Sequence, residues 1–250
     1  MTGKSSTGGV AGRRVLVVGA SSGIGLGIGL GLSRAGADVA FAARRVDRLE
    51  RAVAECSARA AAIGCDVRDP ESCVRVVQRT VEALGGLDAL VYTAGTTAFV
   101  EAAKATADDW WITLGTNLVG AAIVTAAART HLAAARGHAI YLSSNSARFY
   151  SPWRGLGLYT ASKRGLESLV QSLRLENPEI AFTTLVAGPT ASEFGRDAGE
   201  DAAEFGAEWY RKEQVTGPGL LEPADHARVV LEILTSEPRT LVSEVVVEPR

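Results

Sequence analysis

Tyr159 and Lys163 are separated by four positions, in a segment whose apolar residues recur at helical spacing. On a helix, this spacing places both side chains on the same face. Free tyrosine has a pKa of about 10 and is a poor acid or base at neutral pH, but a fixed ammonium group beside it stabilises the phenolate. The pair is therefore a candidate proton donor. Because Tyr-x-x-x-Lys also occurs by chance on exposed helices, the interpretation depends on the surrounding sequence.

A serine hydroxyl precedes this pair in the chain. The predicted strand 139–143 ends next to Ser144. A hydroxyl held there could polarise a carbonyl oxygen during proton transfer. The competing interpretation is an ordinary turn residue that follows a strand.

A glycine-rich stretch, Gly19-Ala-Ser-Ser-Gly-Ile-Gly25, lies between the first predicted strand and the first predicted helix. The N–H groups and dipole of a helix N-terminus favour an anion such as a dinucleotide pyrophosphate, and glycines let the backbone approach it closely. A strand-to-helix turn without a ligand is the alternative, but the position in the chain favours phosphate binding. The predicted contacts are Gly19, Ser21, Ser22, Gly23, Ile24 and Gly25.

The residues after the second predicted strand indicate which dinucleotide binds. An NAD-selective loop places an acid there against the ribose 2′-hydroxyl, whereas the 2′-phosphate of NADP(H) needs a cation. The sequence instead has Ala43-Arg44-Arg45. Two guanidinium groups and no acid predict charge-assisted bonds to a phosphate, so NADP(H) is the expected cofactor. Alternatively, both arginines simply begin a solvated helix face with Arg48 and Arg51.

Short aliphatic runs alternate with amphipathic stretches along the chain, and these elements must position the residues above. The predicted strands are 15–18, 39–43, 60–63, 87–92, 139–143, 180–186 and 241–247, and the predicted helices are 24–35, 47–56, 70–84, 107–135, 158–176 and 223–235. This alternation predicts an α/β fold with a parallel sheet covered by helices on both faces. The acidic segment 192–221 interrupts it and is predicted to be a mobile lid with a short helix near 202–213.

Composition limits the partners of the 250-residue chain. Its net charge of −2 and pI near 6.0 argue against bulk electrostatic binding to nucleic acid or anionic lipid. The three cysteines lack the spacing of a disulfide framework or a metal site, which favours a reducing, cytoplasmic location. Residues 1–12 are predicted to be a flexible tail and 13–250 a single domain. The longest apolar run, 118–128, is too short to span a membrane.

Taken together, these motifs resemble the NADP(H)-dependent branch of the short-chain dehydrogenase/reductase family over nearly the whole chain after the tail. Further matching motifs are Asp66-Val67, Ala94-Gly95, Asn117 and Gly188-Pro189. The resemblance implies a Rossmann-like doubly wound sheet of about seven strands in the order 3-2-1-4-5-6-7. It also implies a catalytic tetrad and an extended cofactor site. The tetrad is Asn117, Ser144, Tyr159 and Lys163. Added cofactor contacts are Asp66 and Val67 at the adenine, Ala94, Gly95, Tyr159, Lys163 at the ribose, Gly188, Pro189, and Ser192 at the carboxamide.

Two departures from the family's pattern matter. The usual Asn-Asn-Ala-Gly is Tyr92-Thr93-Ala-Gly here, so hydrogen bonds that brace the central sheet must be replaced or lost. The family's serine precedes its tyrosine by fewer residues than Ser144 precedes Tyr159, which makes Ser146 a competing candidate. The strand-end pattern favours Ser144.

The predicted function is hydride transfer between NADP(H) and a carbonyl or secondary alcohol, with Tyr159 donating the proton and Lys163 and Asn117 linking it to water. Aromatic side chains near the site suggest an apolar or ring-bearing ketone, although several could simply pack the lid. They are Phe99, Phe149, Tyr150, Trp153, Phe194 and Trp209. A non-catalytic NADP(H)-binding regulator is the alternative, and an epimerase or dehydratase would normally carry a larger C-terminal domain. A homodimer or homotetramer is expected through 110–135 and 158–175.

Overall fold

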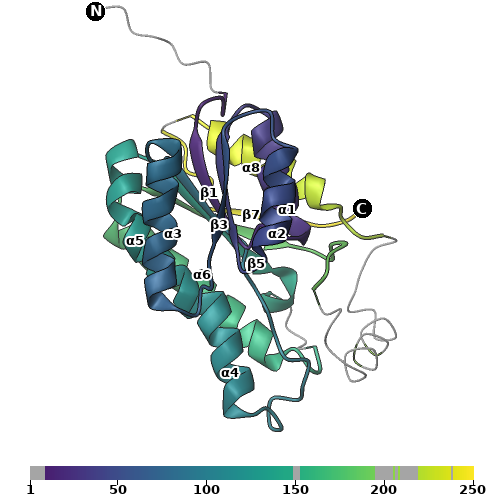
Figure 1. Cartoon of the computed structure of the whole chain (residues 1–250). Coiled ribbons are helices and arrows are strands. Elements are labelled where there is room, and N and C mark those ends of the chain that lie inside the picture. The colour runs from purple at the N-terminus through teal and green to yellow at the C-terminus, as the bar shows by residue number, and fades with distance from the viewer. Residues whose placement is uncertain (1–8, 149–152, 195–204, 206–207, 209–218, 238) are drawn as a thin grey trace, which may run out of the picture.

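A computed structural model describes residues 9–148, 153–194, 205, 208, 219–237 and 239–250 (Figure 1). Its centre is a seven-stranded sheet with the order β3-β2-β1-β4-β5-β6-β7, in which all neighbouring strands are parallel. The strands are β1 Arg14–Val18, β2 Asp38–Ala43, β3 Ala60–Gly64, β4 Ala89–Tyr92, β5 His138–Ser144, β6 Ala181–Ala187 and β7 Glu244–Val247. This confirms the predicted fold class and strand order.

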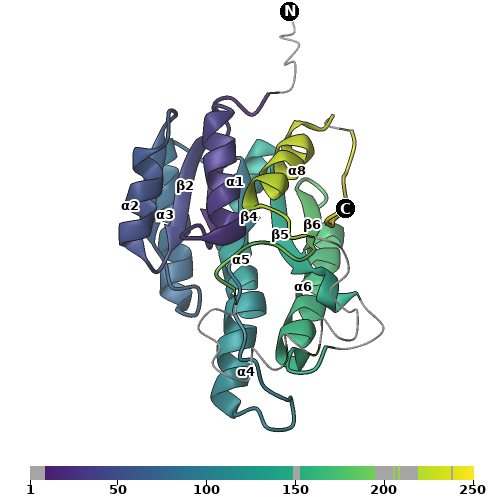
Figure 2. The same cartoon turned by 90° about the vertical axis from the view of Figure 1, so that its right-hand side faces the viewer.

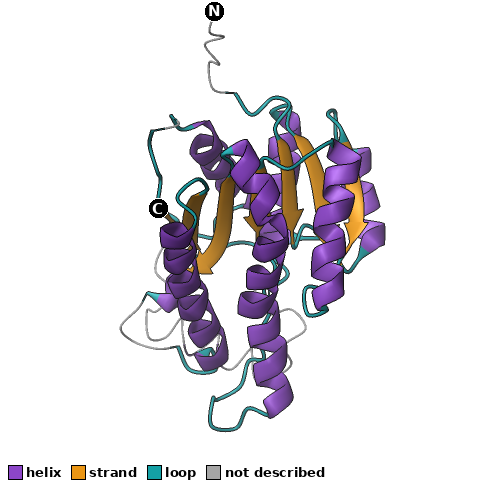
Figure 3. Ribbon diagram, turned by 90° about the vertical axis from the view of Figure 1, so that its left-hand side faces the viewer, coloured by secondary structure: helices purple, strands orange, loops and turns teal. Residues whose placement is uncertain are grey.

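Helices cover both faces of the sheet, because its strands are apolar on both sides. The helices are α1 Gly23–Arg34, α2 Val46–Ala54, α3 Pro70–Leu84, α4 Ala107–Leu114, α5 Gly120–Ala135, α6 Gly157–Glu176 and α8 Pro223–Thr235, with a π-helix Gly115–Val119 and a 3₁₀ turn Asn145–Ala147. Helices α1, α2 and α8 lie on one face (Figure 2), and α3, α5 and α6 on the other (Figure 3). Two hydrophobic cores result, one on each face.

Helices α4 and α5 form one continuous rod through the π-helix, as the predicted helix 107–135 required. By length and composition alone this rod could cross a membrane. In the fold, however, one side of it packs into the core of its face of the sheet, through Ala121, Val124, Ala128 and Leu132. This packing accounts for the apolar residues on that side, whereas Trp111, Ile112 and Val119 of the same rod are exposed.

Helix α1 packs against α8 with almost no side chain between them. A Cβ added to Gly27 would lie 2.5 Å from Cβ of Pro223, and one added to Gly31 would lie 2.6 Å from Cβ of Ala227. The two glycines are four residues apart on α1, and Pro223 and Ala227 are four residues apart on α8. Each glycine therefore lies directly against one small residue of the other helix. This contact holds α8 close to the helix that begins at the phosphate loop.

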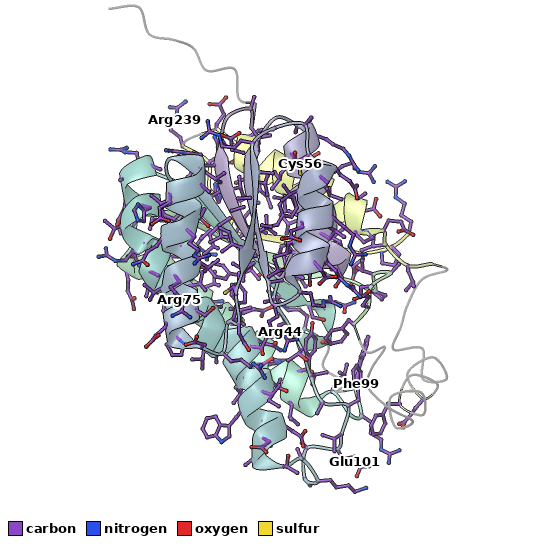
Figure 4. All side chains as sticks on the ribbon, viewed as in Figure 1. Arg44, Cys56, Arg75, Phe99, Glu101 and Arg239 are labelled. Atoms are coloured by element: carbon purple, nitrogen blue, oxygen red, sulfur yellow. The ribbon has the colours of Figure 1, made fainter. Side chains whose placement is uncertain are left out.

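The carboxyl ends of the strands meet at one edge, where all the predicted site residues lie. Figure 4 shows Arg44 and Phe99, which follow β2 and β4, toward this edge, and Cys56 toward the other. The last strand is shorter than the predicted 241–247, because pairing with β6 begins only where Thr184 meets Glu244. The predicted helix near 202–213 and most of the predicted lid lie outside the described residues.

Candidate active site

The loop between β1 and α1 has the backbone geometry of an anion site. Gly19 has φ +91° and Gly23 has φ +53°, both left-handed. A Cβ on Gly19 would come within 2.5 Å of the Ala94 backbone nitrogen. In the described part of the chain no side chain caps α1 at its N-cap Ser22, and its first turn contains no acid. The first N–H groups of the helix are thus available to a phosphate, so the residues present fit a dinucleotide pyrophosphate.

Arg45 connects this loop to the end of β2. Its guanidinium donates to Ser21 Oγ at 3.0 Å and to Ser22 Oγ at 2.8 Å. Arg44 is exposed, and among the described residues we find no hydrogen bond or ion pair from its guanidinium. Both arginines therefore lie at the edge where a 2′-phosphate would bind, with Arg45 fixed against the loop.

An acid does reach this edge, from the segment that follows β6. Glu193 pairs with Arg45 at 2.9 Å and with Arg48 at 2.7 Å. Hydrogen bonds from Arg48 and Arg45 lower the pKa of its carboxyl to about 2. Sequence reasoning looked for an acid only at the end of β2 and missed Glu193, because nothing in the spacing indicates that a segment 148 residues away returns to α2.

Asp66 and Val67 follow β3 at the same edge. Asp66 accepts two hydrogen bonds from the Arg68 guanidinium, at 3.0 and 2.6 Å. This lowers the pKa of Asp66 to about 2, and Arg44 contributes. Val67 is 7 % exposed. The carboxylate is thus ionised and partly engaged, and its contact with an adenine stays a prediction.

Ser144 and Tyr159 come together across the gap between β5 and α6. Burial raises the pKa of Tyr159 to about 12, and a hydrogen bond with Ser144 opposes that rise. The hydroxyl oxygens of Ser144 and Ser146 are 2.9 Å apart, and Ser144 Oγ also accepts from the backbone N–H of Ser146. The structure therefore places Ser144 against the tyrosine and Ser146 in hydrogen-bond contact with Ser144, and the choice of catalytic serine stays a prediction.

Lys163 is only 2 % exposed and lies one helical turn after Tyr159. Its Nζ donates to the Leu142 carbonyl at 2.7 Å and lies 5.5 Å from the centre of the Tyr159 ring. Burial lowers the pKa of the ammonium to about 8, and the charge of Glu167 opposes this. The cation is thus held beside the phenol and is only partly protonated a little above neutral pH.

Glu167, one turn beyond Lys163, was not singled out from the sequence. It accepts hydrogen bonds from Ser143 Oγ at 2.6 Å and from Arg148 Nε at 3.0 Å. Arg148 also pairs with Glu244 at the start of β7. The four-residue spacing from Lys163 was the available signal, and the network ties the serine loop to α6 and β7.

Asn117 lies in the π-helix and is fully buried. Its Nδ2 donates to the Thr96 carbonyl at 2.9 Å and to Ser162 Oγ at 2.8 Å, and its Oδ1 accepts from Thr96 N–H. Its side chain therefore braces the loop after β4 against α6. A Cβ on Gly95 would lie 3.5 Å from Lys163 Nζ and 3.7 Å from Asn117 Oδ1, so this loop runs beside both tetrad members.

The two residues that depart from the family's Asn-Asn pair supply replacement hydrogen bonds. Tyr92 OH donates to the Thr116 carbonyl at 2.6 Å, and Thr93 Oγ1 donates to the Val18 carbonyl at 2.8 Å. In the π-helix the N–H of Gly120 bonds to the Gly115 carbonyl, one residue further back than in an α-helix. The Tyr92 hydroxyl thus bonds a carbonyl of the π-helix next to Asn117.

The segment after β6 closes the site. The Gly188 N–H donates to the Val247 carbonyl at 2.8 Å, and the Pro189 carbonyl accepts from Leu221. Ser192 approaches the phosphate loop, where its Cβ would be 3.2 Å from a Cβ on Gly23. All three predicted residues therefore lie along the same edge.

Of the predicted aromatic residues, Phe194 lies with its ring centre 4.9 Å from that of Tyr159 and 5.7 Å from that of Phe99. Trp153 is 9 % exposed. Phe149, Tyr150 and Trp209 lie outside the described residues. An aromatic surface thus adjoins the tyrosine that is expected to donate the proton.

Comparison with known proteins agrees with this geometry. The sequence profile of the family described as short chain dehydrogenase matches residues 13–203. Glycine betaine reductase ATRR of Emericella nidulans is 33% identical over 254 aligned positions, covering 97% of this chain and 19% of that protein. The 11-beta-hydroxysteroid dehydrogenase-like 2 protein of Arabidopsis thaliana is 34% identical over 188 positions, covering 72% of this chain and 59% of its own length. The chain thus spans about a fifth of the first relative and under two thirds of the second.

A short chain dehydrogenase from Burkholderia cenocepacia, solved in complex with NADP, superposes with a TM-score of 0.82 at 28% identity, over 96% of this chain and 97% of that one. The chain belongs to the short-chain dehydrogenase family. Members of this family are oxidoreductases that bind a nicotinamide cofactor and act on small molecules.

Proposed function

We propose that the protein transfers hydride between NADP(H) and a carbonyl or secondary alcohol, and that its substrate is an apolar or ring-bearing ketone in the reducing direction. The observation that carries this proposal is the arrangement of Ser144, Tyr159 and Lys163, in which a partly buried phenol meets a serine hydroxyl with an ammonium one turn away. A protein that only binds the cofactor has no need of this arrangement.

Each residue of the chain has a distinct task in this proposal. With a pKa of about 12, Tyr159 keeps its proton at neutral pH and is ready to donate it to a forming alkoxide. The Ser144 hydroxyl hydrogen-bonds the carbonyl oxygen, and Lys163 stabilises the phenolate left behind. Bound NADPH supplies the hydride.

The preference for NADP(H) rests on Arg44 and Arg45. Arg45 is positioned on Ser21 and Ser22, and Arg44 is exposed beside it. Guanidinium groups suit a phosphomonoester, and no acid follows β2 directly. The NADP-bound Burkholderia relative supports the same choice. Titration with NADPH and NADH tests it: Arg44→Ala and Arg45→Ala should each reduce the preference for NADPH, and equal affinity of the unaltered protein for both would contradict it.

The proposal of an apolar substrate rests on Phe194, whose ring lies next to Tyr159, and on Phe99, whose ring lies next to Phe194. A planar or ring-bearing ketone can stack on such a surface while its oxygen reaches the hydroxyls. A turnover screen of carbonyl compounds with NADPH, followed by nicotinamide absorbance, would identify the substrate.

The catalytic assignment is tested by matched serine and tyrosine variants. Tyr159→Phe should lower turnover by about 10²–10⁴ while NADPH affinity changes only a few-fold, because a general acid is lost and the fold is kept. Ser144→Ala should also be strongly impaired. Ser146→Ala, which removes a hydroxyl two residues away, serves as control and should lose much less. If Tyr159→Phe kept most of its activity, the non-catalytic regulator would be the better interpretation.

We further propose that residues 13–250 form one catalytic domain, located in the cytoplasm and assembled as a homodimer or homotetramer through α4–α5 and α6. Exposed apolar side chains on these helices support the assembly, with Trp111 71 % and Leu175 84 % exposed. Light scattering at micromolar concentration tests it, and a monomer would contradict it.

A further inference from the structure

Three consecutive residues after β6 reach across the whole cofactor-binding edge. Ser192 adjoins Gly23 of the phosphate loop, Glu193 pairs with the arginines after β2, and Phe194 packs on Tyr159. We call Ser192–Phe194 the strap. Its middle residue brings the only acid that we find in ion-pair contact with these arginines among the described residues.

The carboxylate of Glu193 lies between two guanidinium groups as a bound anion would. Arg48 NH1 donates to both of its oxygens, at 2.7 and 2.8 Å, and Arg45 NH1 donates to one at 2.9 Å. Arg45 occupies the N-cap position of α2 and Arg48 follows three residues later, so both face the same side. The cluster has the donor set that recognises a phosphate, but an acid of the chain itself fills it.

Building on the proposed preference for NADP(H), we propose that Glu193 is a specificity-determining residue that competes with the cofactor's 2′-phosphate for Arg45 and Arg48. A phosphate approaching these arginines meets a like charge already paired with them. The carboxylate must leave before the phosphate can use both guanidinium groups, whereas NADH, which lacks this phosphate, does not require that exchange. Glu193 thus weakens NADP(H) binding selectively and moderates the preference that the arginines create.

The ion pairs are accessible enough to exchange. The Glu193 side chain is 34% exposed, that of Arg45 43% and that of Arg48 37%. Exposed pairs contribute little each, so an incoming phosphate can replace them. Arg45 would keep its bonds to Ser21 and Ser22 during the exchange, because these use its other nitrogens.

The test compares Glu193→Gln, which keeps the shape and removes the charge, with Glu82→Gln. Glu82 is exposed on α3, so the control makes the same change of net charge on another helix. Calorimetric titration measures four ligands: NADPH, NADH, 2′,5′-ADP and ADP. Of the last two, 2′,5′-ADP carries the 2′-phosphate and ADP lacks it. Neither contains a nicotinamide, so their affinities report on the phosphate alone.

We expect Glu193→Gln to bind NADPH and 2′,5′-ADP about three- to tenfold more tightly, the size expected for two exposed ion pairs. Affinity for NADH and ADP should stay within about twofold, and Glu82→Gln should match the unaltered protein for all four ligands. Dissociation of NADPH, measured by stopped-flow fluorescence, should slow by a similar factor, because affinity differences between related complexes arise mainly in dissociation.

Unchanged affinity of Glu193→Gln for 2′,5′-ADP would overturn the inference. An affinity for ADP that increases by the same factor as the affinity for 2′,5′-ADP would overturn it too. Weaker binding of all four ligands would overturn it as well, since Glu193 would then support the bound cofactor. The proposed cofactor preference is judged separately, by the NADPH-to-NADH ratio of the unaltered protein. If the unaltered protein showed no preference for NADPH, the comparison of 2′,5′-ADP with ADP would still test the role of Glu193.

Discussion

Replacing Tyr92 with phenylalanine tests whether its hydroxyl positions Asn117. The change removes the 2.6 Å hydrogen bond to the Thr116 carbonyl and nothing else. Tyr92 is 1 % exposed, so no water replaces the lost donor. A net hydrogen bond contributes about 1 kcal/mol, and an unsatisfied buried carbonyl costs about 1–3 kcal/mol, part of which is recovered because the buried hydroxyl is gone too. We expect a loss of about 1–2 kcal/mol in the free energy of unfolding.

That loss corresponds to about 2–8 °C in Tm for a domain of this size. Turnover should fall as well, by up to about tenfold, because a misplacement of 1 Å in a catalytic group can cost about 100-fold and the shift here is smaller. Urea unfolding gives the stability change, and steady-state kinetics on a substrate from the screen gives kcat and KM separately. The effect should fall on kcat.

Tyr141→Phe is the matched control, one strand away. Tyr141 is paired with Tyr92 in the sheet register and is equally buried. Its hydroxyl lies 2.6 Å from Thr125 Oγ1, whose single hydrogen is already donated to the Ala121 carbonyl. Its loss therefore leaves no orphaned carbonyl, and stability should fall by only about 1 kcal/mol, with kcat unchanged. Equal kcat in both variants would refute the positioning role of Tyr92.

The rate of carbonyl reduction should decrease as the pH rises through the Lys163 pKa of about 8, because the ammonium that stabilises the Tyr159 phenolate then loses its proton. A pH profile of the rate that stays flat above pH 8 would contradict this prediction. Arg136→Gly should stabilise the fold by about 0.5 kcal/mol in urea unfolding, because Arg136 ends α5 at φ +48° and glycine takes that conformation without strain. Gly27→Ala should destabilise it by about 1–3 kcal/mol in the same assay, since the new methyl group would overlap Pro223 of α8; an unchanged midpoint would mean that the two helices separate at little cost.

The parallel sheet could be predicted because each strand is a short apolar run and each crossover a long amphipathic one, whereas the strand order came from the resemblance to the family. The site positions followed because parallel strands bring their carboxyl ends to one edge. The choice of Ser144 over Ser146 rests on the same ground, since a strand end fixes a residue better than a count through a loop, and it stays a prediction.

Other features depend on contacts that no local pattern encodes. The ion pairs of Glu193 join parts of the chain that are far apart in sequence, and the acid looked like one of many in a polar segment. The departure from the family's pattern at Tyr92 was visible in the sequence, but the hydrogen bond that replaces the lost one was not, because its acceptor lies in a π-helix that no local pattern predicted. The start of β7 was set by its neighbour's register and not by its own apolar residues.

The glycine contact between α1 and α8 has a consequence for how this protein can diversify. At Gly27 and Gly31 the helices meet through backbone and methyl groups, so no side chain there can be enlarged to retune their spacing. Sequence divergence elsewhere in the protein must therefore leave these positions small, and α8 keeps a constant distance from the helix that begins at the phosphate loop. Among relatives, the spacing of these two helices should accordingly vary less than the surfaces around them.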